Sequence, residues 1–208
     1  MSATRAAATA VTLAALALGL TACGDDDGDP SSDNSPDIDP TSESTSASTD
    51  PSTSTEPNGP KPIPTSYPDV GLEYDALPDV EGKYRDALAV FVAFDRGRLQ
   101  LLREAKLNPL LSDHAAEPVV ATFQSTAAYL QQHNAYYRGT STASFDNVEE
   151  EGDLLGLDLC LDGSALRYVE GGSASAPDGP ARVPFRVIVT QRDGTWTVTE
   201  ASTQEGTC

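Results

Sequence analysis

The chain has few of the side chains that most often carry chemistry. Its 208 residues include one Met, one Trp, two His and three Cys, and 13 basic residues stand against 32 acidic ones. Without basic clusters, a nucleic-acid partner is excluded. The spacing of Cys and His fits no zinc site. Gly-rich phosphate loops and the H-E-x-x-H and G-x-S-x-G motifs are also missing from the sequence. The sequence therefore predicts no metal and no cofactor.

Long apolar runs are lacking too, yet residues 1–22 have the layout of an export signal. Arg5 is their only charge, and the uncharged run that follows ends at Leu20. This run has the length of a signal-peptide core and is too short for a membrane-spanning helix, which needs roughly 20 apolar residues. A cleavable signal predicts that the mature chain lies outside the cytoplasm. Its net charge is then −20, because only Arg5 is lost from the count.

The end of this run, Leu20-Thr21-Ala22-Cys23, resembles the lipobox of bacterial lipoproteins. The resemblance implies that the Cys23 thiol receives a diacylglycerol and that the Ala22–Cys23 bond is cut. Acyl chains such as palmitate would then hold the protein on the extracytoplasmic face of the cell membrane. The alternative is an ordinary secretory signal followed by a chance Cys. The scarcity of Lys beside abundant Ala and Arg resembles the usage of a GC-rich, actinobacterial-type genome.

Residues 23–66 have the composition of a disordered tether. From Gly24 onward, Ser, Thr, Pro, Asp and Gly dominate the segment, ten acidic residues face one Lys, and only three side chains are apolar. Such a segment cannot bury enough surface to offset the entropy of ordering it, and its charges repel one another. We expect a spacer between the membrane and a domain at 67–208.

The domain at 67–208 is predicted to be α+β. Apolar residues at helical spacing indicate one long helix over 80–105 and a second over 116–137. After Gly139 the period falls to two, which indicates strands. Asp162-Gly163 and Asp193-Gly194 are typical hairpin turns. We expect strands at the ranges 144–150, 155–161, 166–170, 183–192 and 195–202, with a flexible loop at 171–179.

This order, together with a final Arg-Asp-Gly-Thr-Trp-Thr-Val run and Cys160-Leu161-Asp162 at a strand end, resembles the nuclear-transport-factor-2-like (NTF2-like) domains. The resemblance is to the lipoprotein branch of that family, whose function is unknown. It implies a cone in which long helices pack on a curved antiparallel sheet. Such cones hold a small apolar ligand, a catalytic dyad, or nothing.

Two cysteines remain once Cys23 is assigned to lipid. Cys160 lies on a predicted strand and Cys208 is the last residue. Two thiols in an exported domain most often pair, so a disulfide is predicted. A redox role is less favoured because no C-x-x-C is present.

The sequence offers one candidate pocket constellation. Asp95 falls on the apolar stripe of the first helix, and Tyr129, His133 and Tyr136 recur at i, i+4 and i+7 on the second. Ketosteroid-isomerase-like relatives of the resembled fold use a carboxylate base and tyrosine donors inside the cone. A buried Asp would have a raised pKa, which suits proton abstraction. Alternatively, Arg98 lies three residues on and pairs with Asp95.

Three functions stay open from the sequence. The favoured one is a non-enzymatic binding or accessory domain in the cell envelope, with an apolar small molecule, an envelope protein or a cell-wall polymer as its partner. The alternative is an isomerase-like or hydrolase-like enzyme acting in the cone. A third is an inert spacer, which predicts no ligand-sized pocket.

Overall fold

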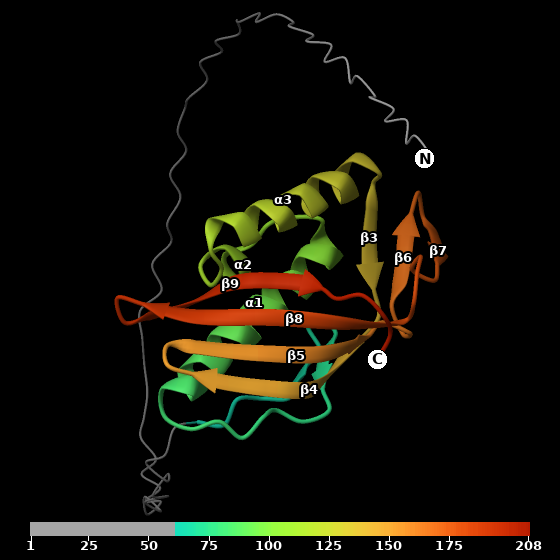
Figure 1. Ribbon diagram of the computed structural model, residues 1–208. Helices are drawn as coiled ribbons and strands as arrows, with labels where there is room; N and C mark the ends of the chain where they lie inside the picture. Colours follow the sequence, from blue (N-terminus) through green and yellow to red (C-terminus); the bar gives the residue numbers. More distant parts are fainter. Residues whose placement is uncertain (1–60) are drawn as a thin grey trace, which may run out of the picture. The chain divides into compact units, whose positions relative to one another are not determined.

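The computed structural model describes residues 61–208 (Figure 1). The predicted signal, Cys23 and the tether up to residue 60 lie outside the described residues. Ordered structure begins earlier than the expected first domain residue, Tyr67. Ser66 already pairs with Glu73, and the Thr65 carbonyl accepts a hydrogen bond from the Tyr74 amide at 2.8 Å.

Six strands form one curled sheet in the order β1-β2-β4-β5-β8-β9, antiparallel throughout except where β2 meets β4. Irregular registers near Phe145 in β4 and near Ile188 in β8 bend the sheet, as bulges do. The strands are β1 (Ser66–Tyr67), β2 (Leu72–Tyr74), β4 (Ser141–Glu151), β5 (Leu154–Asp162), β8 (Arg182–Arg192) and β9 (Thr195–Thr203).

A second, smaller sheet stands at one end of the first, in the order β3-β6-β7. Its strands are β3 (Ala135–Arg138), β6 (Arg167–Glu170) and β7 (Ser173–Ser175). The expected hairpin between the strands at 155–161 and 166–170 is wrong, because β5 pairs with β4 and β8 while β6 pairs with β3 and β7. The Asp162-Gly163 turn leads the chain out of the large sheet instead of folding it back.

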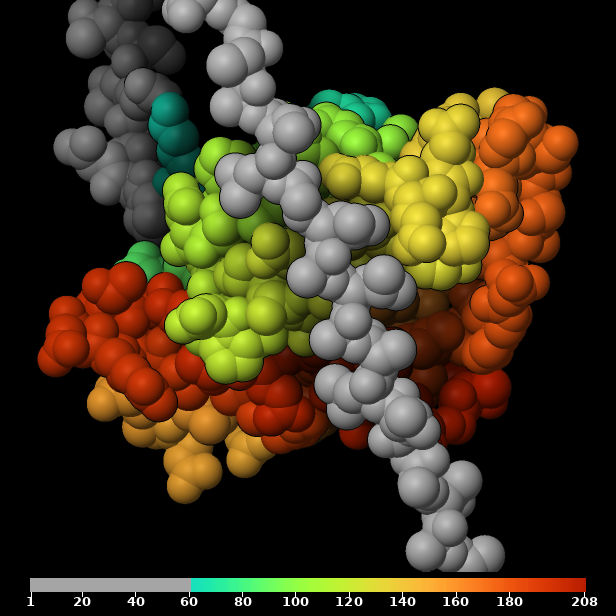
Figure 2. Space-filling model, turned by 90° about the horizontal axis from the view of Figure 1, so that it is seen from above, coloured from blue at the N-terminus to red at the C-terminus, as the bar shows by residue number. Residues whose placement is uncertain are grey.

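Three helices lie on the concave side of the large sheet: α1 (Lys83–Glu104), α2 (Pro109–Ser112) and α3 (Glu117–Gln132). α1 contacts β5, β8 and β9, and α3 contacts β9. Figure 2 shows α3 next to the red C-terminal strands. The predicted first helix is confirmed. The second ends at Gln132, five residues before its expected end, and the chain then enters β3.

The core lies between the sheet and α1. Fully buried side chains from the sheet, α1, α2 and α3 meet there, and the largest are Phe91, Phe94, Leu72, Leu99, Leu101, Leu111, Leu130, Leu155, Leu157, Leu159, Val187 and Val189. The loop before α3 continues the sheet, because the Ala116 amide bonds the Val198 carbonyl at 2.8 Å. This contact covers part of the outer edge of β9, which would otherwise present unpaired backbone groups. The fold is thus α+β, with a curled sheet that is mostly antiparallel.

The last hairpin follows its predicted turn. Asp193 and Gly194 both have positive φ, at 51° and 79°, as a two-residue type I′ turn requires. β8 and β9 leave this turn in register from Arg192 paired with Thr195. The far ends of these strands reach the small sheet's end of the molecule, where the cavity described next is found.

Candidate functional site

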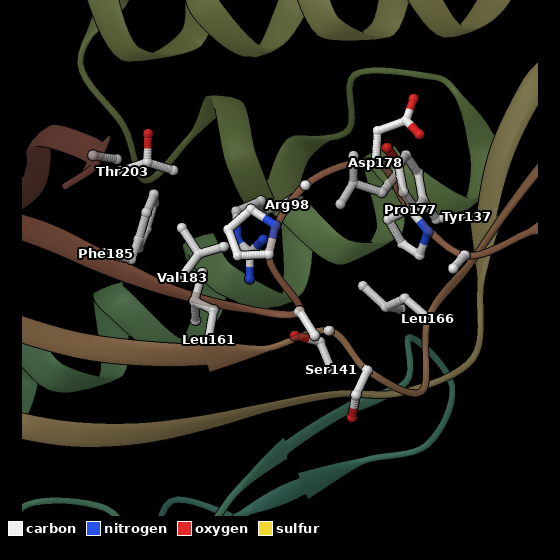
Figure 3. Close-up of a pocket in the computed structure, with 18 of the residues that line it drawn as sticks. Arg98, Tyr137, Ser141, Leu161, Leu166, Pro177, Asp178, Val183, Phe185 and Thr203 are labelled. Atoms are coloured by element: carbon white, nitrogen blue, oxygen red, sulfur yellow. The ribbon is translucent and has the colours of Figure 1, made fainter. Parts of the chain in front are cut away.

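A cavity of about 820 Å³ lies where α1 and α3 approach the ends of β5, β8 and β9 (Figure 3). Most of its walls are aliphatic or aromatic, and a few polar side chains interrupt them. The lining residues are Arg98, Leu102, Thr122, Phe123, Tyr137, Ser141, Leu161, Gly163, Ser164, Leu166, Ala176, Pro177, Asp178, Gly179, Pro180, Ala181, Val183, Phe185, Ala201, Ser202 and Thr203. Pockets of this size and composition accommodate small organic molecules.

One wall comes from the segment between β7 and β8, residues 176–181. The sequence predicted a flexible loop over 171–179. Part of that range forms β7, while Pro177 in the remainder and Pro180 just after it limit the backbone where it borders the cavity. Figure 3 shows Pro177 opposite Val183 and Phe185 across the cavity.

A buried polar chain begins in the core and ends at this cavity. The Tyr74 hydroxyl donates to Asp95 Oδ2 at 2.9 Å, and Arg98 Nε donates to Asp95 Oδ1 at 2.7 Å. Asp95 is 1% exposed and Arg98 is 9% exposed. Burial is the main cause that raises the pKa of the Tyr74 hydroxyl well above its usual value, and the Asp95 charge adds to it. The predicted pairing of Asp95 with Arg98 is confirmed.

Arg98 is the charged member of this chain that lines the cavity. Its guanidinium carbon lies 5.6 Å from the centre of the Phe185 ring, a cation–π distance. Its Nη2 is buried and has no hydrogen-bond partner among residues 61–208. A buried donor without an acceptor is costly, and more so on a charged group.

The four residues predicted to share a pocket are not brought together. Asp95 is buried beside Arg98, whereas Tyr129 is 53% exposed and Tyr136 is 40% exposed, and none of the four lines the cavity. The expected shared pocket is therefore wrong. Two things account for this: α3 ends early, which puts Tyr136 on β3, and Tyr129 lies on the exposed side of α3, away from its buried residues Ala127 and Leu130.

Tyr129, His133 and Tyr136 belong to the outer surface around the end of α3. The rings of Tyr129 and His133 lie 4.3 Å apart, and His133 Nδ1 lies 3.1 Å from Glu170 Oε1 on β6. Nearby, the ring of Tyr137 packs edge-on against Tyr168 at 5.3 Å. Loss of solvent around Tyr168, together with the Glu170 charge, raises the pKa of Tyr168 to about 12.

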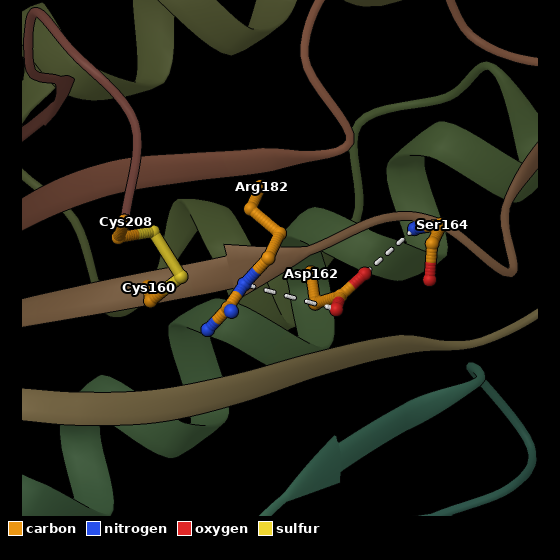
Figure 4. The surroundings of a disulfide bond; sticks show 5 residues. All are labelled: Cys160, Asp162, Ser164, Arg182 and Cys208. Atoms are coloured by element: carbon orange, nitrogen blue, oxygen red, sulfur yellow. Dashed lines mark hydrogen bonds and ion pairs between the residues drawn. A yellow bond between two sulfur atoms is a disulfide. The ribbon is translucent and has the colours of Figure 1, made fainter.

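The predicted disulfide between Cys160 and Cys208 is confirmed (Figure 4). It ties the C-terminus to β5 directly beside Leu161, a cavity residue. In the following turn, Asp162 accepts a hydrogen bond from the Ser164 amide at 2.8 Å. Hydrogen bonding by the Ser164 side chain, and then by this amide, lowers the pKa of Asp162. The bridge and the turn together fix the part of the cavity wall that β5 supplies.

Other candidate sites are weaker. A second hollow of about 430 Å³ lies near the loop before α1 and is bordered by Asp75 and Asp146. Two carboxylates near the end of β4 form ion pairs, Glu149 with Arg186 and Asp153, just after the strand, with Lys83. Among residues 61–208, no three His, Cys, Asp or Glu side chains gather closely enough to hold a metal ion.

Sequence reasoning missed most of the cavity. No pattern in the sequence distinguishes Tyr74, and the helical spacing predicts for Arg98 only a pairing with Asp95. The alternation around Val183 and Phe185 predicts a strand and indicates nothing about a cavity. The one available signal was the position of Arg98, because a charged residue three positions after Asp95 stays on the same side of the helix.

Comparisons with known proteins leave the chain without an assigned family. No family model matches it, and no curated protein matches it significantly. Solved structures that are similar include the intermembrane space region of the chloroplast protein ARC6, at 15% identity and a TM-score of 0.46, covering 61% of this chain and 98% of that one. A de novo β-sheet design matches at 13% identity and a TM-score of 0.34, over 60% and 92% of the two chains.

A third similar structure is a protein titled Rd1NTF2_05 with several substitutions, at 12% identity and a TM-score of 0.25 over 59% of this chain and 94% of that one. These likenesses concern overall shape and carry no argument about activity. No helix within residues 61–208 is both long and apolar enough to cross a membrane.

Proposed function

We propose that this chain is a lipid-anchored binding protein of the cell envelope whose NTF2-like domain holds a small apolar molecule. The observation that carries the proposal is the cavity of about 820 Å³ with its mostly apolar wall. The cavity is open to solvent on one side, and several of its lining residues are exposed. A bound apolar molecule would remove this mostly apolar wall from water, which favours binding.

The proposal is a non-enzymatic one. The carboxylate that a cone-type isomerase would need is Asp95, and each of its oxygens accepts a hydrogen bond, from Tyr74 or Arg98. Asp95 also does not border the cavity. The residues that do border it supply shape and apolar surface, which suits holding a molecule more than transforming it.

The arrangement of helices and sheet and the predicted lipid anchor fit the same proposed function. Helices lie in the concave side of a curled sheet, which is the arrangement an NTF2-like cone requires. A lipid on Cys23 and a spacer would keep that cone near a membrane, which is a source of apolar molecules. The competing proposal is that the domain binds an envelope protein on its outer surface.

Binding can be tested with the neutral fluorescent probe N-phenyl-1-naphthylamine on the full chain carrying Cys23→Ser, which removes the expected lipid site. We expect saturable binding at one site per chain. Ala201→Trp should weaken it roughly tenfold or more, because the indole fills the cavity that Ala201 borders. The matched control is Glu200→Trp, on the preceding and exposed position of β9.

The outcomes separate the hypotheses. Loss of binding in A201W with retention in E200W supports a ligand in the cavity. Equal binding by both variants, or no saturable binding by the parent, would overturn the proposal and favour a protein partner or a spacer role. Circular dichroism of each variant shows that the fold is kept.

The anchor has its own test. We predict that the full chain expressed in a lipoprotein-processing bacterium incorporates an alkyne-tagged palmitate and partitions with membranes. Cys23→Ser should abolish both, since the thiol is the acylated group. Cys208→Ser is the matched control and should still label. Unchanged labelling of C23S would contradict the lipobox interpretation.

A further inference from the structure

We infer that the molecule held in the cavity is an acid, an aliphatic or alicyclic body with one carboxylate, and that the Arg98 guanidinium receives the carboxylate. This inference rests on the proposed binding function and adds the chemical class of the ligand. The observation behind it is a single buried guanidinium at an otherwise mostly apolar wall, with a donor that has no acceptor.

The hydrogen bonds that Arg98 makes do not use its Nη2 donor. A guanidinium has five N–H groups in a planar fork. Nε donates to one oxygen of Asp95, and the Tyr74 hydroxyl donates to the other. Nη2 is buried without a partner among residues 61–208. Two other buried side-chain nitrogens in this part of the chain share that condition, Arg96 Nε and Trp196 Nε1, but only Arg98 borders the cavity.

The position of Arg98 suits a ligand's head group. Figure 3 shows Arg98 near the middle of the labelled side chains, with Phe185 and Val183 to one side and Tyr137 and Pro177 to the other. A carboxylate in the cavity beside Arg98 would face the charge of its guanidinium while the ligand's apolar body lies against the surrounding wall. The carboxylate of Asp178, the one acidic group in the lining, is directed away from Arg98 in this view.

A carboxylate is favoured over a neutral acceptor. A carboxylate adds a full opposite charge beside the guanidinium, which a neutral acceptor lacks, and this attraction is stronger where water is excluded. A carboxylate also matches the planar fork of a guanidinium, which an ester or an alcohol does not. A cationic head group would be repelled by Arg98 and would leave its donor unpaired.

The first test varies the ligand and leaves the protein intact. Laurate, methyl laurate and dodecylammonium, each kept below its micelle concentration, compete with bound N-phenyl-1-naphthylamine on the full chain carrying Cys23→Ser. We expect laurate to bind about tenfold or more tightly than the ester, the value of one charged hydrogen bond. Dodecylammonium should bind weakest.

The second test varies the protein. Arg98→Met alone would strand a buried Asp95 charge, so the informative variant is Asp95→Asn with Arg98→Met, which removes both charges together. It should keep probe binding and lose the preference for laurate over its ester. Arg192→Met, an exposed Arg on β8 outside the cavity, is the matched control and should keep the preference.

The failure of this inference differs from the failure of the proposed function. If methyl laurate competes as well as laurate, or if the double variant keeps the preference, the carboxylate assignment is wrong and the apolar cavity stands. If the probe itself does not bind, the proposed function falls and this inference falls with it.

Discussion

At the scale of single residues, the buried chain of Tyr74, Asp95 and Arg98 is the main polar feature of an apolar core. Its three members come from β2 and α1 and are joined by hydrogen bonds of 2.9 and 2.7 Å. Removing one partner of such a set leaves the next one buried and unpaired, which costs more than the bond itself contributes. These hydrogen bonds therefore fix how α1 packs against β2 and where Arg98 borders the cavity.

Tyr74 predicts how the stability of the chain depends on alkaline pH. Burial and the nearby Asp95 charge raise the pKa of its hydroxyl in the folded state. The unfolded chain then loses this proton from about pH 10, while the folded chain retains it. Titration of Tyr74 should leave the free energy of unfolding unchanged below that pH and should lower it as pH rises above it.

Urea unfolding at pH 8 to 11 measures this dependence. Tyr74→Phe should make the alkaline loss shallower while lowering stability at pH 8 by about 1–3 kcal/mol, through loss of the bond to Asp95. Tyr136→Phe, at an exposed site on β3, is the control and should reproduce the parent curve. An alkaline slope in Y74F as steep as that of the parent would contradict the explanation.

At the scale of elements, α1 and α2 are held together by a glycine and an asparagine. A Cβ at Gly97 would lie 2.5 Å from the Leu111 backbone nitrogen and 2.8 Å from the Leu110 carbonyl carbon. Asn108 caps α2, accepting from the Leu111 amide at 3.2 Å, and its own amide donates to the Gly97 carbonyl at 2.8 Å. The two helices thus approach at backbone distance.

Because the two helices approach so closely, helix propensity and steric clash predict opposite changes in stability for Gly97→Ala. Helix propensity alone predicts that Ala stabilises an interior helical position by about 1 kcal/mol relative to Gly. The clash predicts destabilisation of about 1–3 kcal/mol, because the Leu111 backbone must shift. We expect the second result in a thermal or chemical unfolding curve. Ala89→Gly, at an exposed position on the same helix, shows the propensity effect by itself.

Elements with strong local signals could be predicted, and those defined by distant partners could not. The helical stripe gives α1, and Asp193-Gly194 gives the β8–β9 hairpin, because both signals lie within a few residues of sequence. The strand at Arg167–Glu170 was found but assigned to the wrong neighbour, since its partner β3 lies about 30 residues earlier in the chain. Strand pairing at such separations leaves no local mark.

The same limit applies to the candidate site. Pairing of Asp95 with Arg98 was predictable because both lie on one helix. Extending the second helix through Tyr136 misplaced that residue, although His133, Asn134 and the Tyr-Tyr pair that follows form helices less readily than the preceding residues. The cavity itself depends on contacts between α1, α3, β8 and the segment 176–181, which only the folded chain brings together.

At the scale of the whole molecule, the disulfide closes the C-terminus onto the sheet. Cys160 and Cys208 are 48 residues apart in sequence, and their Cα atoms lie 5.8 Å apart. On the chain-entropy model, a loop of this length stabilises the folded state by about 4 kcal/mol. The residues enclosed by the loop include β8, β9 and most of the cavity wall.

Loss of this bridge should therefore destabilise the whole domain. We expect the double variant Cys160→Ser, Cys208→Ser to unfold at lower guanidinium concentration, with a loss of about 2–4 kcal/mol. Reductant should lower the midpoint of the parent chain and leave that of the double variant unchanged. A parent midpoint that does not respond to full reduction would contradict a stabilising role.

The function proposed for this protein requires that its ligand bind in the cavity. The most direct measurement is a methyl-detected NMR titration of the full chain carrying Cys23→Ser with N-phenyl-1-naphthylamine. We predict shifts of the methyl signals of Leu161, Leu166 and Val183, which border the cavity. Shifts confined to residues around the exposed Tyr129 and Tyr136, or none at saturating probe, would contradict the claim.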